Sequence, residues 1–412
     1  MNVLKKRWGY LAMAVLVLLF MGIGYAFSLF VVPIEQDLGL TRADTSFVFT
    51  LCFICFALGS LVTGFMIQKI SPKWLLRAGA CMIFAGFWLS TRVTSLWQLY
   101  ITYSICCGYA IGIAYNIMIS LLPLYFHDKI GIATGTLLMG YAMSTTVLGP
   151  PCQSLMAATG WRTCFLVLGI CGAVVLTLGS VVIHVPNREQ ELQLPSAEKT
   201  GHGGLEFSPS RMIRTKTYFV FLTIYISIGG VGMSFINHGA LILQEDFAMS
   251  AGISAVLVGF VCLFNGIGRV LWGIMYDRIG SARSLQYLGI LLVLGMMTAL
   301  ISLLVKNSVF TVIGMALILF IYGGSSSLAP IIVRALFGDQ YFSMNFAVTN
   351  IGTMILSGVP ALIGSLQTVY HSYLVPYFVL LGLAVLALLM ANLYHITARN
   401  EFSNKSQPFS TS

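Results

Sequence analysis

The chain has 412 residues, of which 58% are hydrophobic and only 8% are charged, and its formal net charge is +9. A soluble domain has roughly 25% charged residues, so this chain has too few to cover a water-soluble surface. The composition excludes a soluble globular protein and indicates an integral membrane protein, whose basic residues lie in connectors rather than on a face that binds nucleic acid.

Twelve apolar runs are long enough to cross a bilayer, because a helix needs about 20 apolar residues to span the hydrocarbon core. The first run is too long for the apolar region of a cleaved signal peptide and is predicted to be a retained span. Pro150 and Pro151 predict a break near the outer end of the fifth span, as a gate bend or as a simple helix end. The expected spans are 8–32, 43–68, 74–92, 96–122, 130–155, 161–185, 217–243, 251–276, 284–305, 309–336, 341–368 and 373–397.

A long polar stretch separates the sixth run from the seventh. The predicted fold class is therefore an all-α membrane protein with twelve transmembrane helices in two six-helix halves. The halves are 1–185 and 217–398, joined by a cytoplasmic linker, 186–216, and followed by a disordered cytoplasmic tail, 399–412. With both termini in the cytoplasm, seventeen of the 22 Lys and Arg residues fall in inside connectors and four at outside ends. The positive-inside rule thus predicts cytoplasmic termini.

The connectors after the second and eighth spans share one pattern, in which glycine is followed four residues later by a polar residue and then by a basic one. Its recurrence at the same place in each half is typical of duplicated transporter halves. A chance match between two basic connectors is the alternative. The residues predicted to act in this inside-loop motif during conformational change are Gly64, Lys69, Gly273, Asp277, Arg278 and Gly280.

Together these features resemble the major facilitator superfamily over nearly the whole chain, except that Gln68 stands where the family usually has Asp. Finer similarity is to the oxalate/formate antiporter family, which is related to the monocarboxylate transporters. It lies in residues 125–135, in residues 208–215 just before the seventh span, and in the eighth span around Asn265 and Arg269. The resemblance implies transport by alternating access, with Arg269 binding a substrate carboxylate.

Arg269 is a basic residue inside an apolar run, and its planar guanidinium matches a carboxylate bidentately. All acidic residues lie in connectors or at span ends, so no mid-span carboxylate is expected to neutralise it. This favours an anionic substrate. Asn265 lies one turn earlier on the same face, where it can orient the arginine or the ligand. Two alternatives stay open: snorkelling of the side chain toward the headgroups, and pairing with a protein carboxylate.

Several tyrosines lie well inside spans, where a hydroxyl needs a partner. The resemblance implies that they surround the substrate with aromatic rings, and a packing role is the alternative. The resembled family also has a second cation, a lysine, in the eleventh span. Alignment places Thr353 there, with Asn350 three residues before it, and one cation favours a monocarboxylate over a dianion. The deep tyrosines are Tyr25, Tyr115, Tyr141 and Tyr322.

The predicted function is secondary transport of a small organic anion such as pyruvate, lactate or formate, in a monomer in a bacterial cytoplasmic (inner) membrane. Its partners are the carboxylate, a counter-anion or proton, and the lipid bilayer, with no nucleic acid. Exchange and proton symport both stay open, with Asp246 as a weak candidate for a proton carrier. A transporter-like sensor of carboxylic acids and an oxalate-type dicarboxylate exchanger are the alternatives. No enzyme, catalytic residue, cofactor or metal site is predicted, and the nine cysteines are interpreted as packing thiols.

Overall fold

The computed structural model describes residues 3–183, 185–186 and 206–402, and every regular element in those residues is a helix. The chain divides into two compact units. Unit 1 comprises Met1–Asp128 and Thr136–Ala197, and unit 2 comprises Lys129–Gly135 and Glu198–Ser412. The predicted boundaries of the halves stay predictions. The predicted linker lies largely outside the described residues, at 187–205, and so does most of the predicted tail, at 403–412.

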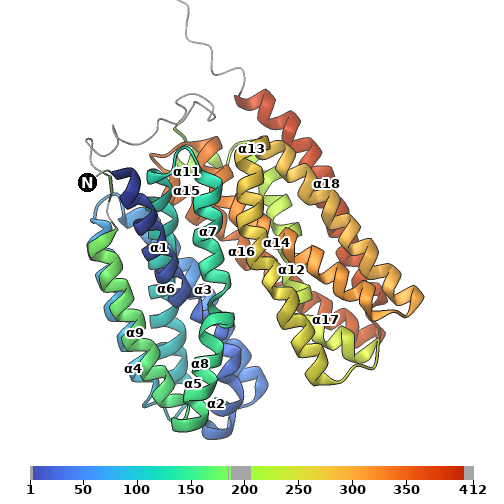
Figure 1. Cartoon of the computed structure of the whole chain (residues 1–412), viewed down its shortest axis with the longest axis horizontal. Coiled ribbons are helices and arrows are strands. Elements are labelled where there is room, and N and C mark those ends of the chain that lie inside the picture. The colour runs from blue at the N-terminus through green and yellow to red at the C-terminus, as the bar shows by residue number, and fades with distance from the viewer. Residues whose placement is uncertain (1–2, 184, 187–205, 403–412) are drawn as a thin grey trace, which may run out of the picture. The chain divides into compact units, whose positions relative to one another are not determined.

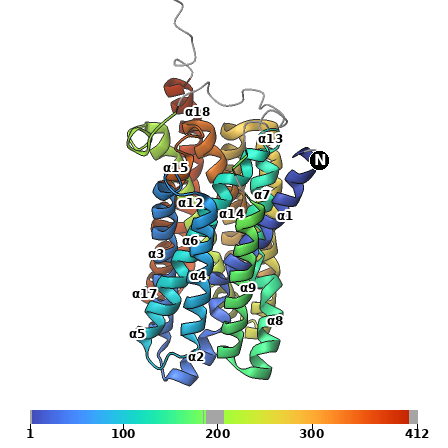
Figure 2. The same ribbon diagram turned by 90° about the vertical axis from the view of Figure 1, so that its left-hand side faces the viewer.

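Unit 1 contains the blue to green helices of Figure 1, and α4 packs along α9 (Figure 2). Helix α7 begins in the short segment that groups with unit 2 and continues in unit 1. The elements are α1 (Val3–Met21), the 3₁₀ helix η1 (Gly22–Leu29), α2 (Val31–Leu38), α3 (Arg42–Met66), α4 (Pro72–Ser90), α5 (Leu96–Leu99), the π-helix η2 (Tyr100–Cys107), α6 (Gly108–Leu121), the 3₁₀ helix η3 (Leu122–Tyr125), α7 (Ile130–Ala142), α8 (Ser144–Thr159) and α9 (Trp161–Val182).

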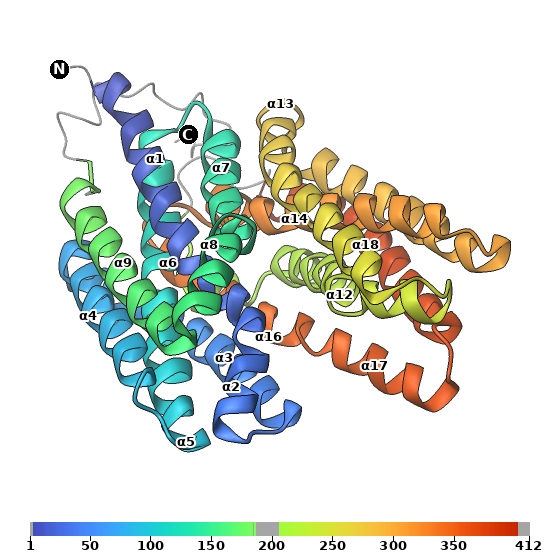
Figure 3. The same cartoon turned by 60° about the horizontal axis from the view of Figure 1, so that its bottom comes forward.

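Unit 2 contains the yellow-green to red helices (Figure 3). The eleventh predicted span of the chain is divided into the three short helices α15, α16 and α17. Its elements are α11 (Pro209–Met212), α12 (Lys216–Glu245), α13 (Ala251–Val305), α14 (Ser308–Phe337), α15 (Phe342–Asn350), α16 (Gly352–Leu356), α17 (Val359–Tyr370) and α18 (Leu374–Phe402).

Ten helical stretches in the described residues are long and apolar enough to cross a membrane. One of them, Gly252–Val305, has 54 residues and contains a kink at Gly280, where φ is 75° and the backbone is not helical. Glycine tolerates that conformation because it has no Cβ. Helix α4 is not among the ten, and it carries Lys73 and Arg77 in its first two turns. The number is ten rather than the predicted twelve because the 54-residue stretch covers two predicted spans and α4 is not counted.

Two helix boundaries differ from the sequence predictions. The first apolar run is not one helix, because α1 ends at Met21 and the chain continues as 3₁₀ turns. The fifth predicted span is interrupted at Met143, whereas α8 runs through Pro150 and Pro151, so the predicted break at Pro150 is wrong. The interruption at Met143 lies where η1 packs against the chain. A Cβ at Gly22 would collide with the backbone oxygen of residue 141 and with residue 144. The η1 backbone therefore lies against this break.

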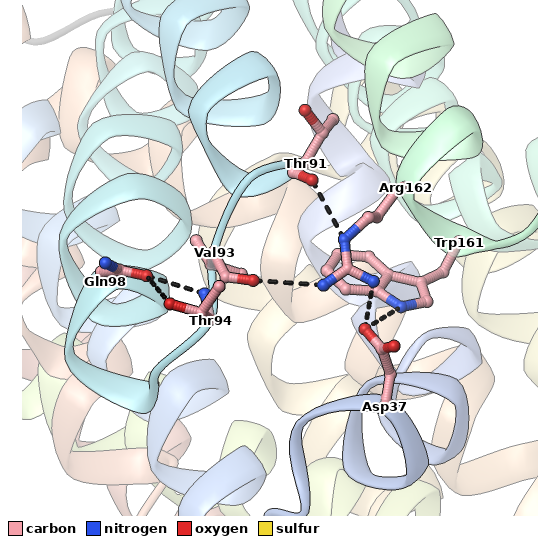
Figure 4. Close-up of polar contacts among 7 residues, drawn as sticks. All are labelled: Asp37, Thr91, Val93, Thr94, Gln98, Trp161 and Arg162. Atoms are coloured by element: carbon pink, nitrogen blue, oxygen red, sulfur yellow. Dashed lines mark hydrogen bonds and ion pairs between the residues drawn. The ribbon is translucent and has the colours of Figure 1, made fainter.

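One end of unit 1 is held together by a polar cluster around Arg162 (Figure 4). Arg162, the second residue of α9, forms an ion pair with Asp37 of α2. Its other guanidinium N–H groups donate to the backbone oxygens of Thr91 and Val93, at 3.0 and 3.1 Å. Trp161 donates to the same carboxylate at 3.2 Å. Three chain segments are thereby joined through one arginine.

A buried arginine lies at the start of unit 1. Arg7 of α1 is 7% exposed and binds Asp128 through both terminal nitrogens, at 2.6 and 3.0 Å. Its guanidinium carbon also lies 5.0 Å from the ring centroid of Phe126. Bidentate pairing of this kind is the stronger form of ion pair. Arg7 is therefore a structural residue that ties α1 to the chain after η3.

Candidate functional site

Arg269 lies in α13 and is only 5% exposed. Its Nε donates to the Oδ1 atom of Asn265, 3.3 Å away and one helical turn earlier. The predicted proximity of these two residues is present in the structure. Asn265 is 6% exposed, and its Nδ2 group has no hydrogen-bond partner among the described residues. Unit 2 thus holds a buried guanidinium beside a neutral amide on α13.

Glycines fix the position of this part of α13 against α14. A Cβ at Gly268 would collide with the backbone oxygen of Phe320, and a Cβ at Gly323 would collide with that of Asn265. The two backbones therefore approach too closely for any side chain at these positions. As a result, Arg269 extends from a rigid helix pair rather than from a loop.

A second group of polar side chains joins α12 to α15 and α16. The Thr353 hydroxyl donates to Oδ1 of Asn350 at 2.9 Å, and the Tyr225 hydroxyl lies 3.2 Å from the Thr353 oxygen. A threonine hydroxyl has one proton, so Tyr225 must be the donor in the second bond. Asn350 is 4% exposed, and its Nδ2 group has no hydrogen-bond partner in the described chain.

Tyr225 connects this group to the arginine. The charge of Arg269 interacts electrostatically with the Tyr225 hydroxyl. We call Arg269, Asn265, Tyr225, Thr353 and Asn350 the arginine network. Sequence reasoning identified four of these five residues and missed Tyr225. Tyr225 could have been found by its depth in the seventh predicted span, because the other tyrosines were selected for the same property.

Tyr322 lies in the same unit, on α14, and is 8% exposed. A Cβ placed on Gly232 of α12 would meet its Cβ at 2.5 Å, so the tyrosine packs against that helix. This contact fits the packing alternative, and the predicted role in substrate binding stays a prediction.

The tyrosines of unit 1 form a group of their own. The rings of Tyr115 and Tyr141 lie 5.1 Å apart between centroids, and Phe56 lies 5.1 Å from Tyr115 and 6.4 Å from Tyr141. The structure brings the two predicted tyrosines together with a phenylalanine that sequence reasoning missed. Tyr25 lies in η1, and its side chain is outside the described residues.

The inside-loop motif after the eighth predicted span has a clear local structure. The Asp277 carboxylate accepts hydrogen bonds from the backbone N–H groups of Gly131 and Ile132, at 2.8 and 3.1 Å. These donors belong to the first turn of α7, in the segment that groups with unit 2. A carboxylate there satisfies N–H groups that a helix start leaves open. Gly131 and Gly273 also approach so closely that neither tolerates a side chain.

The remaining motif residues have different surroundings. Gly280 supplies the left-handed backbone at the kink of α13, and Arg278 is exposed. In the first copy of the motif, Gly64 is buried and Lys69 is exposed just after α3. The conformational role predicted for these residues stays a prediction.

The sequence profile of the Major Facilitator Superfamily matches residues 12–359. The chain belongs to this family. It is therefore a multi-pass membrane transporter rather than an enzyme. Two curated relatives are the oxalate:formate antiporter of Oxalobacter formigenes, 27% identical over 84% of this chain and 81% of that protein, and monocarboxylate transporter 12 of Xenopus laevis, 25% identical over 59% and 55%.

Solved structures of the superfamily show the same fold. The proton:xylose symporter XylE matches with a TM-score of 0.71 and 15% identity, over 97% of this chain and 96% of that one. The fucose transporter FucP in its outward conformation matches with a TM-score of 0.66 and 13% identity, over 95% and 98%. At these identities the likeness concerns the fold alone.

Within this superfamily member, the predicted site residues fall into two sets. Unit 2 places Arg269, Asn265, Asn350 and Thr353 in one network, and unit 1 places Tyr115 beside Tyr141. The arginine network holds one cation and otherwise neutral polar groups. Its chemistry suits a ligand with one carboxylate and further hydrogen-bond acceptors.

Proposed function

We propose that this major facilitator protein is a secondary transporter of small monocarboxylates, and that it works by alternating access with Arg269 binding the carboxylate. The observation that carries the proposal is Arg269 itself, which is 5% exposed in an apolar helix and bonded to a neutral amide. Ionisable residues at membrane depth are costly and usually serve function. The planar guanidinium of arginine matches the two oxygens of a carboxylate.

The charge of the site supports a monoanion. Thr353 is neutral, and its hydroxyl is bonded to Tyr225 and Asn350. One cation matches one carboxylate, as in pyruvate, lactate or formate. The names of the relatives, an oxalate:formate antiporter and a monocarboxylate transporter, support small carboxylates as the class.

The same proposal includes twelve spans with both termini in the cytoplasm. It is supported by the kink that divides the 54-residue stretch of α13 and by the length of α4. The lysines and arginines of the connectors support the orientation. We further propose that the membrane is a bacterial cytoplasmic membrane, as the similarity to a bacterial antiporter supports.

A second candidate function is exchange of a dicarboxylate such as oxalate. The 27% identity to the oxalate:formate antiporter favours it. The neutral Thr353 argues against it, because a dianion would leave one carboxylate without a cation. Exchange as a mode of transport is compatible with either substrate class.

Transport into proteoliposomes tests the proposal. Purified protein is reconstituted, and uptake of labelled pyruvate, lactate, formate and oxalate is measured with and without unlabelled anion inside. Protein-free liposomes are the control for passive entry of the protonated acids. We expect saturable uptake of at least one monocarboxylate, faster than that of oxalate. Absence of uptake and exchange with every acid would instead favour a sensor, and dominant oxalate exchange would favour the second candidate.

A further inference from the structure

We propose that the start of α4 is a binding site for the headgroup of an anionic membrane phospholipid. The site consists of Lys69, Lys73 and Arg77, together with Trp74, and we call it the basic α4 surface. It belongs to unit 1, whereas the arginine network belongs to unit 2. Lipid binding here does not depend on which substrate the protein transports.

The three basic residues are spaced four positions apart where the chain turns from α3 into α4. Lys69 lies in the turn, Lys73 is the second residue of α4, and Arg77 lies one helical turn further along. Residues four apart on a helix share a face, so Lys73 and Arg77 are neighbours. Both lysines are exposed and Arg77 is partly exposed. The short stretch 69–77 therefore presents three positive charges at the surface of unit 1.

No carboxylate is paired with these charges in the part of the chain that the structure describes. The sequence has no acidic residue from 45 to 127 or from 129 to 188. These two ranges contain η2, α6 and α9, which pack against α4 (Figure 2). By contrast, the buried Arg7 and Arg334 each bind an aspartate. The basic α4 surface is thus left for an anion from outside the protein.

Trp74 indicates that this anion belongs to the membrane. It is the first residue of the third predicted span, 74–92, and it is 61% exposed. Tryptophan is enriched at the boundary between lipid and water, where its ring meets acyl chains and headgroups. The guanidinium carbon of Arg77 lies 4.9 Å from the Trp74 ring centroid, and its Nε donates to the Ser180 hydroxyl of α9 at 3.4 Å. Two contacts therefore hold the arginine beside the exposed ring.

A phospholipid with a net negative charge fits this combination of groups. Its phosphate accepts hydrogen bonds from ammonium and guanidinium groups, and its acyl chains contact the ring of Trp74. A free phosphate ion would meet the charges but not the ring. Phosphatidylcholine carries a cation of its own, which the lysines repel. Each lysine or arginine close to an anionic membrane surface strengthens binding, so phosphatidylglycerol is the lipid with which to test the site.

The test titrates the purified full-length protein, in a neutral detergent, with phosphatidylglycerol, phosphatidylcholine or inorganic phosphate. The melting temperature is followed, and native mass spectrometry measures how much lipid stays bound. Wild type should bind phosphatidylglycerol roughly tenfold more tightly than phosphatidylcholine and should melt at a higher temperature when phosphatidylglycerol is bound. Inorganic phosphate should have little effect.

Variants locate the preference. Lys73→Gln should weaken phosphatidylglycerol binding roughly fivefold, and the combined change of Lys69, Lys73 and Arg77 to glutamine should abolish the preference. The matched control changes Arg211, Arg214 and Lys216 to glutamine. It removes as many charges from unit 2, beside the Glu401 carboxylate that accepts from the backbone N–H of residue 216. This control should keep the preference within about twofold of wild type.

Three outcomes overturn the site. A wild-type protein that binds both lipids equally has no such site. An equal loss of preference in the two triple variants would mean that anionic lipid is attracted to the basic protein as a whole. Equal stabilisation by inorganic phosphate would make the ligand a free anion. If the triple variant of α4 does not assemble, Lys73→Gln decides, because it changes only one exposed side chain, and unchanged phosphatidylglycerol binding in it also overturns the site.

Discussion

Arg162 and Arg269 are two arginines in the same chain with opposite surroundings. Arg162 is 38% exposed and is bound to a carboxylate, to two backbone oxygens and to the face of Trp161, 4.5 Å from its ring centroid. Arg269 is 5% exposed, lies within an apolar helix, and donates to the amide of Asn265. The carboxylate of Asp37 is charged, whereas the amide of Asn265 is neutral.

The difference indicates what each arginine does. Arg162 fastens three segments at one end of unit 1, which is a structural task. Arg269 is placed by close glycine contacts between α13 and α14, and its Nε donates to the neutral amide of Asn265. A cation kept in such a place at the cost of desolvation fits a task that an anionic ligand completes.

The largest effect is expected from Arg269→Gln. Removing the cation should lower kcat/KM for pyruvate by at least about a hundredfold, because losing one partner of a buried charge pair costs roughly 2–5 kcal/mol. The melting temperature should not fall, since no buried charge remains. Transport in proteoliposomes and thermal unfolding of the purified protein measure the two quantities.

Arg162→Gln is the control for that change. It should keep transport within about twofold of wild type and lower the melting temperature by on the order of 2 °C, as expected for an exposed ion pair with additional hydrogen bonds. Retained transport in Arg269→Gln, or lost transport in a folded Arg162→Gln protein, would remove the functional distinction between the two arginines.

A second cation in the arginine network should change the preference between monoanions and dianions. Thr353→Lys places a positive charge where the structure has a neutral hydroxyl, so dianions should gain relative to monoanions. We expect the ratio of oxalate to pyruvate transport to rise about tenfold. Thr353→Gln, which adds length without charge, should leave oxalate disfavoured. If both variants changed the ratio equally, charge would not be the cause.

The Asp277 carboxylate differs from that of Asp37 because its partners are backbone N–H groups rather than an arginine. Asp277→Asn removes the negative charge from the first turn of α7 while it keeps one acceptor oxygen. We expect the turnover rate to fall roughly threefold to tenfold with little change in KM, since the residue lies away from the arginine network. Gln68→Asn, at the equivalent place in the first copy of the motif, is the control. A changed KM with an unchanged turnover rate would contradict this role.

Asp246 is a carboxylate that lacks the kind of partner Asp37 has. Its Oδ2 atom is buried and has no hydrogen-bond partner among the described residues. Burial, and secondarily the charge of Glu245, raise the pKa of Asp246 from 3.8 to about 6. The protonated form is thus favoured in the folded protein. The protonated Asp246 carboxyl therefore contributes stability to the folded protein. This contribution is complete below about pH 4 and is lost as the pH rises through 6.

The smallest predicted effect is a change in unfolding temperature that follows from the raised pKa of Asp246. Asp246→Asn, which resembles the protonated acid, should unfold at a higher temperature than wild type at pH 7.5, and the two should converge near pH 4. We expect a difference of roughly 2 °C, because the residue is only partly buried. Glu245→Gln should raise the unfolding temperature by a small part of this difference. A difference that is constant from pH 4 to pH 8 would exclude titration of Asp246 as its cause.

Much of this protein can be predicted from sequence alone. Composition and run length indicate the membrane class. The repeated pattern of a glycine, a polar residue and a basic residue indicates the superfamily, and an arginine in an apolar run stands out without a structure. Such features are local or compositional, so one chain read in order reveals them. The interruption at Met143 was not predictable in this way, because Pro150 is the stronger local signal and the actual break lies where η1 packs at Gly22.

The arginine network shows what only the tertiary structure decides. Tyr225 and Thr353 are 128 residues apart, and the bond between them depends on how α12 packs against α16. Sequence reasoning therefore identified Arg269 and the neutral Thr353 but missed Tyr225 and the direction of the bonds. Charge and hydrophobicity determine which residues lie in the membrane, whereas helix packing determines which of their hydrogen-bonding groups meet.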